Sequence, residues 1–396
     1  MALTTVSSDR LATNVKNTNF TSAEKQDLTD DIKPLLGSSG GGAKNLIING
    51  AMLVAQRGTS STISGYGTVD RSALVHAGVD EAPTQEQADV AAGTSPYTNG
   101  FRKCFKITNG NQTSGAGAAD FIWYRYKIEA QDLANSGWNY TSSSSNITLS
   151  FWIKSSVAQT FKGYLKTLDG TQYGYAFETG SLTADTWTKI TKTIPGNSNL
   201  TFDNNNDQGM QINILGFMGT DYTDNSVTED AWATYGGAVR TKDQTSTWYT
   251  TNNATLEITG VQLEVGSVAT DFEHRSFHDE RQRCYRYFQR YATGDGKPIG
   301  NGFYYNSTQV KINCNLLTTM RTTPTMAHIT GTHYYVIYRD GAADTFNNLI
   351  LEPSSDQNRC GLYNYEHVSG TAGQTGIVRC NNAAPSGGQV DFSAEL

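Results

Sequence analysis

The chain has 396 residues, of which 37% are hydrophobic and 17% charged, and its formal net charge is −7. This length is typical of two folded domains with an extension. The acidic balance argues against nucleic acid as a partner, because phosphates attract basic surfaces, and no run approaches the roughly 20 apolar residues of a membrane span.

Residues 1–44 are poor in apolar side chains and are expected to form an extended arm and linker. One short helix is predicted there, because Thr21 and Glu24 form a capping box and Pro34 ends the pattern. The segment is either a disordered tail or an arm that attaches the protein to a larger assembly. Its first residues lack the apolar stretch of a secretory signal, so synthesis in a cytoplasm is expected.

Residues 45–275 are rich in alternating apolar residues and in Gly, Asn and Asp turns, which predicts a jelly-roll β-sandwich. The apolar run at 45–58 is expected to begin it as a buried strand. In 147–154, alternation places Phe151 on the core side and Trp152 on the other. The segment 254–265 keeps a period of two with an offset at Gly260, which predicts a bulge. Further strands are expected at 161–168, 172–178, 186–194 and 210–218.

Residues 276–396 are expected to form a helix followed by a smaller C-terminal β-sandwich. The helix is predicted over 278–291, since Cys284, Tyr287, Phe288 and Tyr291 fall on one stripe. Strands then follow near 302–316, 333–338, 375–380 and 389–396. The fold class is therefore mainly β, with an N-terminal arm.

Arg283, Arg286 and Arg290 fall on another face of this predicted helix. Contact with nucleic acid inside a larger particle is one interpretation. The acidic chain and the lack of interleaved lysine favour a salt-bridged contact between domains or subunits.

Metal and redox chemistry have weak signals in this sequence. His274 and His278 have the spacing of zinc ligands, but Arg275 replaces the glutamate of the zinc-protease motif. Asp203 and Asp207 have only part of a calcium-loop pattern, so no cofactor is expected, although a structural Ca²⁺ stays open. Five scattered cysteines without a CxxC pair predict free, buried thiols: Cys104, Cys284, Cys314, Cys360 and Cys380.

Aromatic residues provide the candidate ligand site. Sugars have apolar CH faces and many hydroxyls, so flat rings beside polar groups suit them. Tyr173, Tyr175 and Phe177 alternate on one predicted strand face, and the long loop 222–237 carries aromatic residues beside acids. The alternative is that these rings fill the core or a subunit contact. The candidate glycan platform comprises Trp152, Tyr173, Tyr175, Trp232 and Tyr235.

Several segments resemble bacteriophage tail fibres and related virion structural proteins. They are NLIINGAMLVAQRGTS at 45–60, SFWIKSS at 150–156, VQLEVGSVATDFEHR at 261–275 with the following CYRYFQR, MRTTPTM at 320–326, and the final DFSAEL. The first residues are also similar to leaders of structural proteins in marine and cyanobacterial phages. One departure is Val69, Asp70, Arg71 and Ser72, where the family usually reads ADRW.

The resemblance implies a jelly roll like that of carbohydrate-binding modules, a C-terminal β domain, and a virion protein that is commonly trimeric. We therefore expect a non-enzymatic tail-fibre subunit, made in the host cytoplasm and located in the virion tail. Its arm would contact other tail proteins, and its β domains would bind host-surface polysaccharide. The alternatives are a purely architectural decoration or connector protein, and a polysaccharide depolymerase, which the lack of β-helix repeats disfavours.

Overall fold

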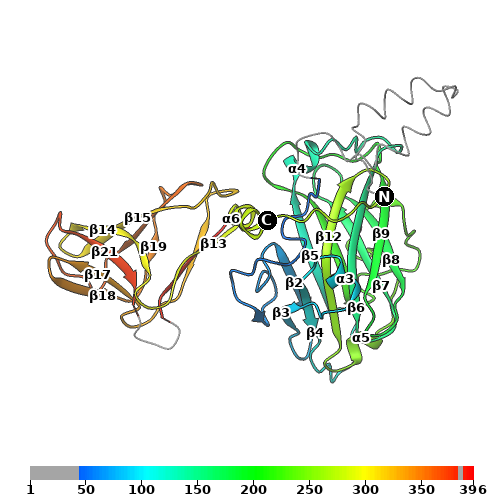
Figure 1. Ribbon diagram of the computed structural model, residues 1–396, viewed down its shortest axis with the longest axis horizontal. Coiled ribbons are helices and arrows are strands. Elements are labelled where there is room, and N and C mark those ends of the chain that lie inside the picture. Colours follow the sequence, from blue (N-terminus) through cyan, green and yellow to red (C-terminus); the bar gives the residue numbers. More distant parts are fainter. Residues whose placement is uncertain (1–43, 382–386) are drawn as a thin grey trace, which may run out of the picture.

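The computed structural model describes residues 44–381 and 387–396, so the predicted arm and its helix lie outside the described residues. Two β-rich bodies lie on either side of helix α6 (Phe277–Tyr285), and the C-terminus lies at the same junction (Figure 1). Within the described part of the chain, no helix is both long and apolar enough to cross a membrane.

The N-terminal body is a sandwich of two six-stranded sheets, as predicted, and the chain passes repeatedly from one sheet to the other, as in a jelly roll. The β12 sheet has the order β1 (Ser60–Ser61), β3 (Thr84–Asp89), β4 (Lys103–Thr108), β12 (Thr255–Val265), β6 (Asn146–Ser155) and β9 (Thr188–Pro195). The β10 sheet has the order β11 (Trp232–Thr234), β8 (Tyr173–Ser181), β7 (Thr160–Thr167), β10 (Gln208–Met218), β5 (Phe121–Glu129) and β2 (Ser72–Ala77). Short helices α3 (Ser95–Thr98), α4 (Ala130–Ala134) and α5 (Thr247–Thr250) lie in its connections.

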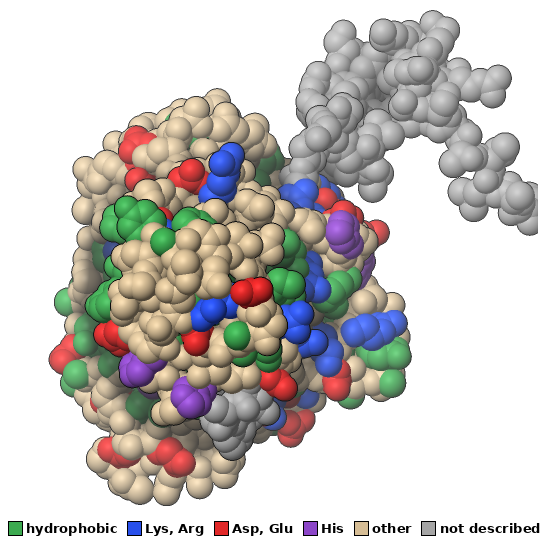
Figure 2. All heavy atoms as spheres, turned by 90° about the vertical axis from the view of Figure 1, so that its left-hand side faces the viewer, with side chains coloured by type: hydrophobic (Ala, Val, Ile, Leu, Met, Phe, Trp, Pro, Cys, Tyr) green, Lys and Arg blue, Asp and Glu red, His purple; other side chains and the backbone are tan. Residues whose placement is uncertain are grey.

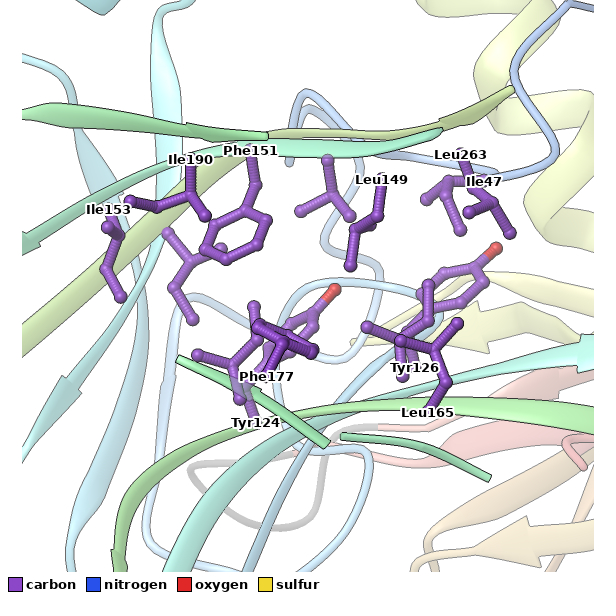
Figure 3. Packing of buried hydrophobic residues seen from close by; sticks show 14 of the residues in the cluster. Ile47, Tyr124, Tyr126, Leu149, Phe151, Ile153, Leu165, Phe177, Ile190 and Leu263 are labelled. Atoms are coloured by element: carbon purple, nitrogen blue, oxygen red, sulfur yellow. The ribbon is translucent and has the colours of Figure 1, made fainter. Parts of the chain in front are cut away.

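The core of this sandwich follows the period-two pattern of its strands. Leu149, Phe151 and Ile153 of β6 are fully buried and point toward Leu165 and Phe177 of the opposite sheet (Figure 3). Full burial of one such side chain stabilises the fold by roughly 1.5–3 kcal/mol. The same alternation turns Trp152 away from the core, as predicted.

The predicted bulge in β12 is confirmed. Gly260 has φ of 63°, and the register against β6 shifts between Thr259 and Gln262. The extra residue of the bulge lets the apolar side chains on both sides of Gly260 point into the core, so Leu256 and Val261 are both fully buried.

The strand predicted at 45–58 is wrong, because this segment forms turns that lie against β12. Asn45 donates from its side chain to the carbonyl of Val261 at 3.1 Å, and the Val261 N–H donates to the carbonyl of Gly50 at 2.9 Å. Asn49 and Met52 have φ of 60° and 59°, values that a strand does not allow. Ile47, Ala51, Met52 and Val54 are buried even though the segment is irregular.

The helix predicted over 278–291 is wrong in its second half. Ser276 caps α6 by accepting the N–H of Asp279 at 3.1 Å, but the helix ends at Tyr285. Residues Phe288–Thr293 form β13, which pairs with β22 (Gln389–Ser393). A partner strand about 100 residues away in sequence therefore overrides the local helical pattern.

The C-terminal body contains two sheets around a second core, in agreement with the predicted mainly β class. The three-stranded sheet has the order β13, β22 and β16 (Thr325–His328). The seven-stranded sheet has the order β18 (Ala342–Phe346), β17 (Tyr335–Arg339), β21 (Thr375–Cys380), β14 (Pro298–Asn306), β15 (Gln309–Asn315), β20 (Arg359–Asn364) and β19 (Ile350–Leu351).

Ion pairs to buried carboxylates join the two bodies. Arg286 Nε and Nη2 each donate to the carboxylate of Glu129 at 2.7 Å, and Arg71 pairs with Glu395. Arg290 pairs with Asp391 at 3.0 Å within the C-terminal body, while Arg283 is exposed. The predicted salt-bridged contact between domains is thus confirmed for Arg286. Arg71 is 1% exposed, and its guanidinium carbon lies 3.4 Å from the Tyr287 ring centroid.

Candidate functional site

The five predicted platform residues do not lie on one surface. Tyr175 is 2% exposed and Phe177 is fully buried, because their positions in β8 point into the core between the sheets. Tyr173 packs against the edge of the same core. For Tyr175 and Phe177, the structure therefore corrects the surface interpretation and supports the alternative of core packing.

Trp232 closes the edge of this core. It lies in β11 opposite Tyr175, with ring centroids 5.2 Å apart in a T-shaped arrangement. Its indole N–H donates to the carbonyl of Pro195 at 2.7 Å, which ties the β10 sheet to the β12 sheet. An indole N–H that is hydrogen-bonded to a backbone carbonyl within the fold is typical of a structural tryptophan.

Trp152 lies on the outer face of the other sheet. It packs there against a small cluster that includes Phe101, Cys104 and Trp187. Of the five predicted residues, Tyr235 is the one that lies over the outer face of the β10 sheet, where it meets side chains that the platform hypothesis did not include.

The outer face of the β10 sheet combines aromatic and basic side chains. Trp123 and Arg125 come from β5, and Tyr164 and Lys166 come from β7, all at positions that alternate with core residues. Asn213 of β10 is the cross-strand partner of both Arg125 and Tyr164, so these side chains form one row across three strands.

The segment 222–242 folds over this row and completes it with Tyr222, Tyr235 and Arg240. The Tyr235 N–H donates to the carbonyl of Gln172 at 2.8 Å, and the Arg240 N–H donates to the carbonyl of Tyr222 at 3.0 Å. The long loop is therefore ordered by contacts within the chain. We call the seven residues of this surface the aromatic–cationic face: Trp123, Arg125, Tyr164, Lys166, Tyr222, Tyr235 and Arg240.

The rings of the aromatic–cationic face lie close to its cations. Tyr164 and Tyr235 are stacked, with centroids 6.4 Å apart and planes at 28°. Lys166 Nζ lies 4.1 Å from the Tyr235 ring centroid, and Arg240 Cζ lies 4.7 Å from that of Tyr222. Cation–π contacts of this kind hold both partners in place and leave the charge available at the surface.

The central rings are covered, and the outer groups are accessible. Trp123 and Tyr164 are 2% and 1% exposed, whereas Tyr222, Tyr235 and the three cations are partly exposed. Burial raises the pKa of the Tyr164 hydroxyl to about 12, so it stays a neutral hydrogen-bonding group at physiological pH. The indole N–H of Trp123 is buried and has no hydrogen-bond acceptor within the described residues.

Two acids of the covering segment, Glu229 and Asp230, are already paired with lysines outside the face. Glu229 accepts from Lys162 at 2.7 Å and lies 3.6 Å from Lys242, and Asp230 pairs with Lys192 at 3.3 Å. These pairs fix the segment to β7 and β9. They also leave the aromatic–cationic face with basic groups as its charged side chains.

The predicted metal signals lie elsewhere and do not converge. His274 precedes α6 and packs on Phe101, while His278 is an exposed residue inside the helix. Asp203 and Asp207 are exposed in the turn before β10. Across residues 44–381 and 387–396, no group of three or more His, Cys, Asp or Glu side chains is placed to hold a metal ion. All five cysteines are buried and unpaired, in agreement with the sequence.

No protein-family model and no curated protein match the chain. Among solved structures, it is similar to the enzymatically active domain of tailspike protein 4 from bacteriophage CBA120, at 10% identity and a TM-score of 0.29 over 56% of this chain and 22% of that one. A structure titled "CBM4 structure and function" gives 14% identity and a TM-score of 0.28 over 55% and 98%. The tandem CBM22 domain of Paenibacillus barcinonensis Xyn10C gives 9% and 0.27 over 91% and 100%. TM-scores this low carry no argument about function.

The sequence held a signal for the aromatic–cationic face that the platform hypothesis did not use. In 121–127, alternation puts Phe121, Trp123 and Arg125 on the side opposite to the core residues Ile122 and Tyr124. In 162–166, Tyr164 and Lys166 alternate with buried Leu165 in the same way. The alternation of side chains along these two strands therefore predicts that Trp123, Arg125, Tyr164 and Lys166 face outward. The position of Arg240 above them depends on the path of the covering segment.

Proposed function

We propose that the aromatic–cationic face binds a saccharide chain. The observation that carries this proposal is the pair of partly exposed rings, Tyr222 and Tyr235, held beside basic groups on a sheet surface. Such rings stack on the CH faces of sugars, and neighbouring donors hydrogen-bond to hydroxyls. Backbone hydrogen bonds at Tyr222 and Tyr235 hold the covering segment in place, so little conformational entropy is lost on binding.

A glycan array followed by calorimetry tests this site on the full-length protein. We expect Tyr235→Ala to weaken binding of the selected glycan by about tenfold or more, because it removes a stacking ring worth on the order of 1–2 kcal/mol. Tyr305→Ala is the matched control, because Tyr305 is 61% exposed on the C-terminal body. Equal affinity of the Tyr235 variant and the unmodified protein would argue against this face as the binding site.

We further propose that the protein is a structural subunit of a phage tail fibre or tail appendage. The ordered succession of tail-fibre-like segments from 45 to 396 supports this role. In this proposal, the arm 1–44 attaches to other tail proteins and several copies bind host polysaccharide together. Binding of one copy raises the effective concentration of polysaccharide at the neighbouring copies, so several weak sites together bind tightly. Light scattering is expected to report a stable trimer, and a monomer at all concentrations would contradict this assembly.

The proposed role is binding without catalysis. Polysaccharide hydrolysis commonly uses two carboxyl groups about 5–10 Å apart, whereas the charged side chains of the aromatic–cationic face are Arg125, Lys166 and Arg240. Incubation with the bound glycan is expected to release no reducing ends. Measurable turnover, abolished in Tyr235→Ala, would instead favour a depolymerase.

A second candidate role is purely architectural and rests on the C-terminal body. Figure 2 shows hydrophobic side chains reaching the surface in several patches at that end of the molecule. Tyr338 and Ile377, cross-strand partners in β17 and β21, are 48% and 43% exposed. Such side chains suit a protein partner. If Tyr338→Ser with Ile377→Ser prevents incorporation into particles while glycan binding is retained, this surface is a virion contact.

A further inference from the structure

Lysines on the outer sheet surfaces of the sandwich are mostly paired with acids. Lys154 lies 2.9 Å from Glu257, Lys106 lies 3.1 Å from Glu86, and Lys162 lies 2.7 Å from Glu229. The chain has 37 Asp and Glu against 30 Lys and Arg, so acidic partners are plentiful. Pairing is therefore the usual arrangement for a cation on these sheets.

The aromatic–cationic face departs from this arrangement. Within the described residues, Arg125, Lys166 and Arg240 form no ion pair with any Asp or Glu. Arg125 donates instead to the side-chain oxygen of Asn213 at 3.1 Å, and Arg240 donates to the carbonyl of Gly237 at 2.9 Å. Three cations thus converge on one surface of an acidic protein without a counter-charge of their own.

The three cations are close enough to affect one another. Burial lowers the pKa of Lys166, and the positive charges of Arg240 and Arg125 lower it further. Like charges that are partly removed from water repel each other, and a bound anion relieves this repulsion. Arg125 and Arg240 also lie over the same ring, at 5.1 Å and 5.7 Å from the Trp123 centroid.

We infer that the saccharide bound by the aromatic–cationic face is anionic and carries carboxylate, phosphate or sulfate groups. This inference rests on the proposed function and names its ligand class. Guanidinium groups bind such oxyanions through paired, charge-assisted hydrogen bonds, and lysine adds a point charge. The rings of Tyr222 and Tyr235 lie beside these cations, so one acidic sugar contacts both kinds of group.

The experiment compares polymers that share a backbone and differ in charge. The full-length protein is titrated with dextran and dextran sulfate, and with polygalacturonate and its methyl ester. The sulfate and carboxylate arms separate the two sources of negative charge. We expect binding of at least one anionic polymer and at least tenfold weaker binding of its neutral counterpart. Binding is also expected to weaken when salt rises from about 0.05 to 0.5 M, because salt screens exposed charges.

Charge-removing variants assign the effect to this face. Arg240→Gln and Lys166→Gln are each expected to weaken anionic binding by about tenfold, the usual effect of losing one charge-assisted hydrogen bond. Arg283→Gln and Lys189→Gln are matched controls, because both residues are exposed and lie outside the aromatic–cationic face. Unchanged thermal midpoints show that the variants remain folded.

The outcomes separate this inference from the proposed function. Equal binding of neutral and anionic polymers, lost in Tyr235→Ala and retained in Arg240→Gln, overturns the anionic inference and leaves saccharide binding intact. Equal weakening by Arg283→Gln or Lys189→Gln also overturns the anionic inference, because the polymer is then attracted to positive charges anywhere on the protein surface. Lack of binding to every polymer and to a glycan array contradicts the proposed function itself.

Discussion

At the residue scale, Glu129 connects the two bodies of the molecule. It is fully buried and accepts hydrogen bonds from Arg286, from the Tyr287 hydroxyl at 2.5 Å and from Gln131 at 2.6 Å. Burial by itself raises the pKa of this carboxyl, but the bonds from Arg286 and Tyr287 outweigh burial and hold the pKa below its usual value. The carboxylate is therefore charged, and both of its oxygens accept hydrogen bonds.

Replacement of this carboxylate is expected to destabilise the protein strongly. Glu129→Ala leaves Arg286 and the buried Tyr287 hydroxyl without their acceptor, at a cost of about 3–5 kcal/mol. Urea unfolding measures the change. Asp89→Asn is the control, because Asp89 pairs with Lys103 but is 81% exposed, and a change below about 1 kcal/mol is expected there. Similar effects in the two variants would contradict the buried role of Glu129.

Asp70 is a buried acid with the opposite pKa shift. Burial raises its pKa from 3.8 to about 6, although the charge of Arg57 and hydrogen bonds from Gln56 act in the other direction. The folded protein therefore holds this proton more tightly than the unfolded chain does. Ionised Asp70 opposes folding above pH 6, and this penalty decreases as the pH falls through 6 toward 4.

The pH dependence of unfolding tests this property. Between pH 7 and pH 5, the wild type is expected to gain about 1 kcal/mol of stability relative to Asp70→Asn, which has no proton to bind. Urea titrations at the two pH values measure the free energy of unfolding of each protein. Titrating groups that both proteins share contribute equally, so their effects cancel in the difference. Parallel pH profiles would show that Asp70 titrates normally.

At the element scale, the turn segment 45–58 depends on one close backbone approach. A Cβ added to Gly50 would lie 2.1 Å from the carbonyl oxygen of Val261, next to the bulge in β12. The two backbones meet there through the hydrogen bond between Val261 and Gly50. Only glycine allows this contact without movement of a backbone.

Gly50→Ala is therefore expected to destabilise the protein by about 2 kcal/mol or more, since the turn must move away from β12. Gly237→Ala is the matched control, because an added Cβ has nothing within 4 Å and the residue has no positive φ. Thermal unfolding of both variants measures the difference. A Gly50 variant as stable as the control would show that the turn adjusts freely.

At the scale of the whole molecule, Glu395 ties the end of the described chain to the first sandwich. Its carboxylate contacts both Arg71 and Arg57, which are 1% and 11% exposed, and the two arginines pack on the rings of Tyr287 and Phe288. Together with the Glu129 cluster, this contact makes the junction a packed, charged interface. The two bodies are therefore expected to unfold together.

Calorimetry tests this coupling. The wild type is expected to show one cooperative transition. Glu395→Ala leaves the buried Arg71 without its acid and removes one of the two acidic partners of Arg57, so it is expected to separate the transitions or lower the midpoint by several degrees. Glu86→Gln is the control, because its pair with Lys106 lies on an outer sheet surface. Two transitions already present in the wild type would show that the junction couples the bodies weakly.

The sequence predicted correctly those strands whose pattern is contained in their own residues. Alternation gave β6, β7, β8, β9, β10 and β12 within a few residues, and the offset at Gly260 gave the bulge. The same reasoning failed for β13, because its helical spacing was overridden by pairing with β22. For the candidate site, it found Tyr235 and missed the residues that Tyr235 meets on β5 and β7.

What the sequence by itself determined is the mainly β class, the direction of side chains such as Phe151 and Trp152, and the burial of the cysteines. The fold class and the side-chain directions follow from period-two patterning, which depends on neighbours in the chain. The burial of the cysteines follows from their scattered spacing without a CxxC pair. Only the tertiary structure decided that Arg240 lies beside Trp123, that Glu129 accepts from Arg286, and that Arg71 meets Glu395. Those contacts join residues more than 100 positions apart, and they depend on which strands pair and how the connecting segments run, information that no local pattern contains.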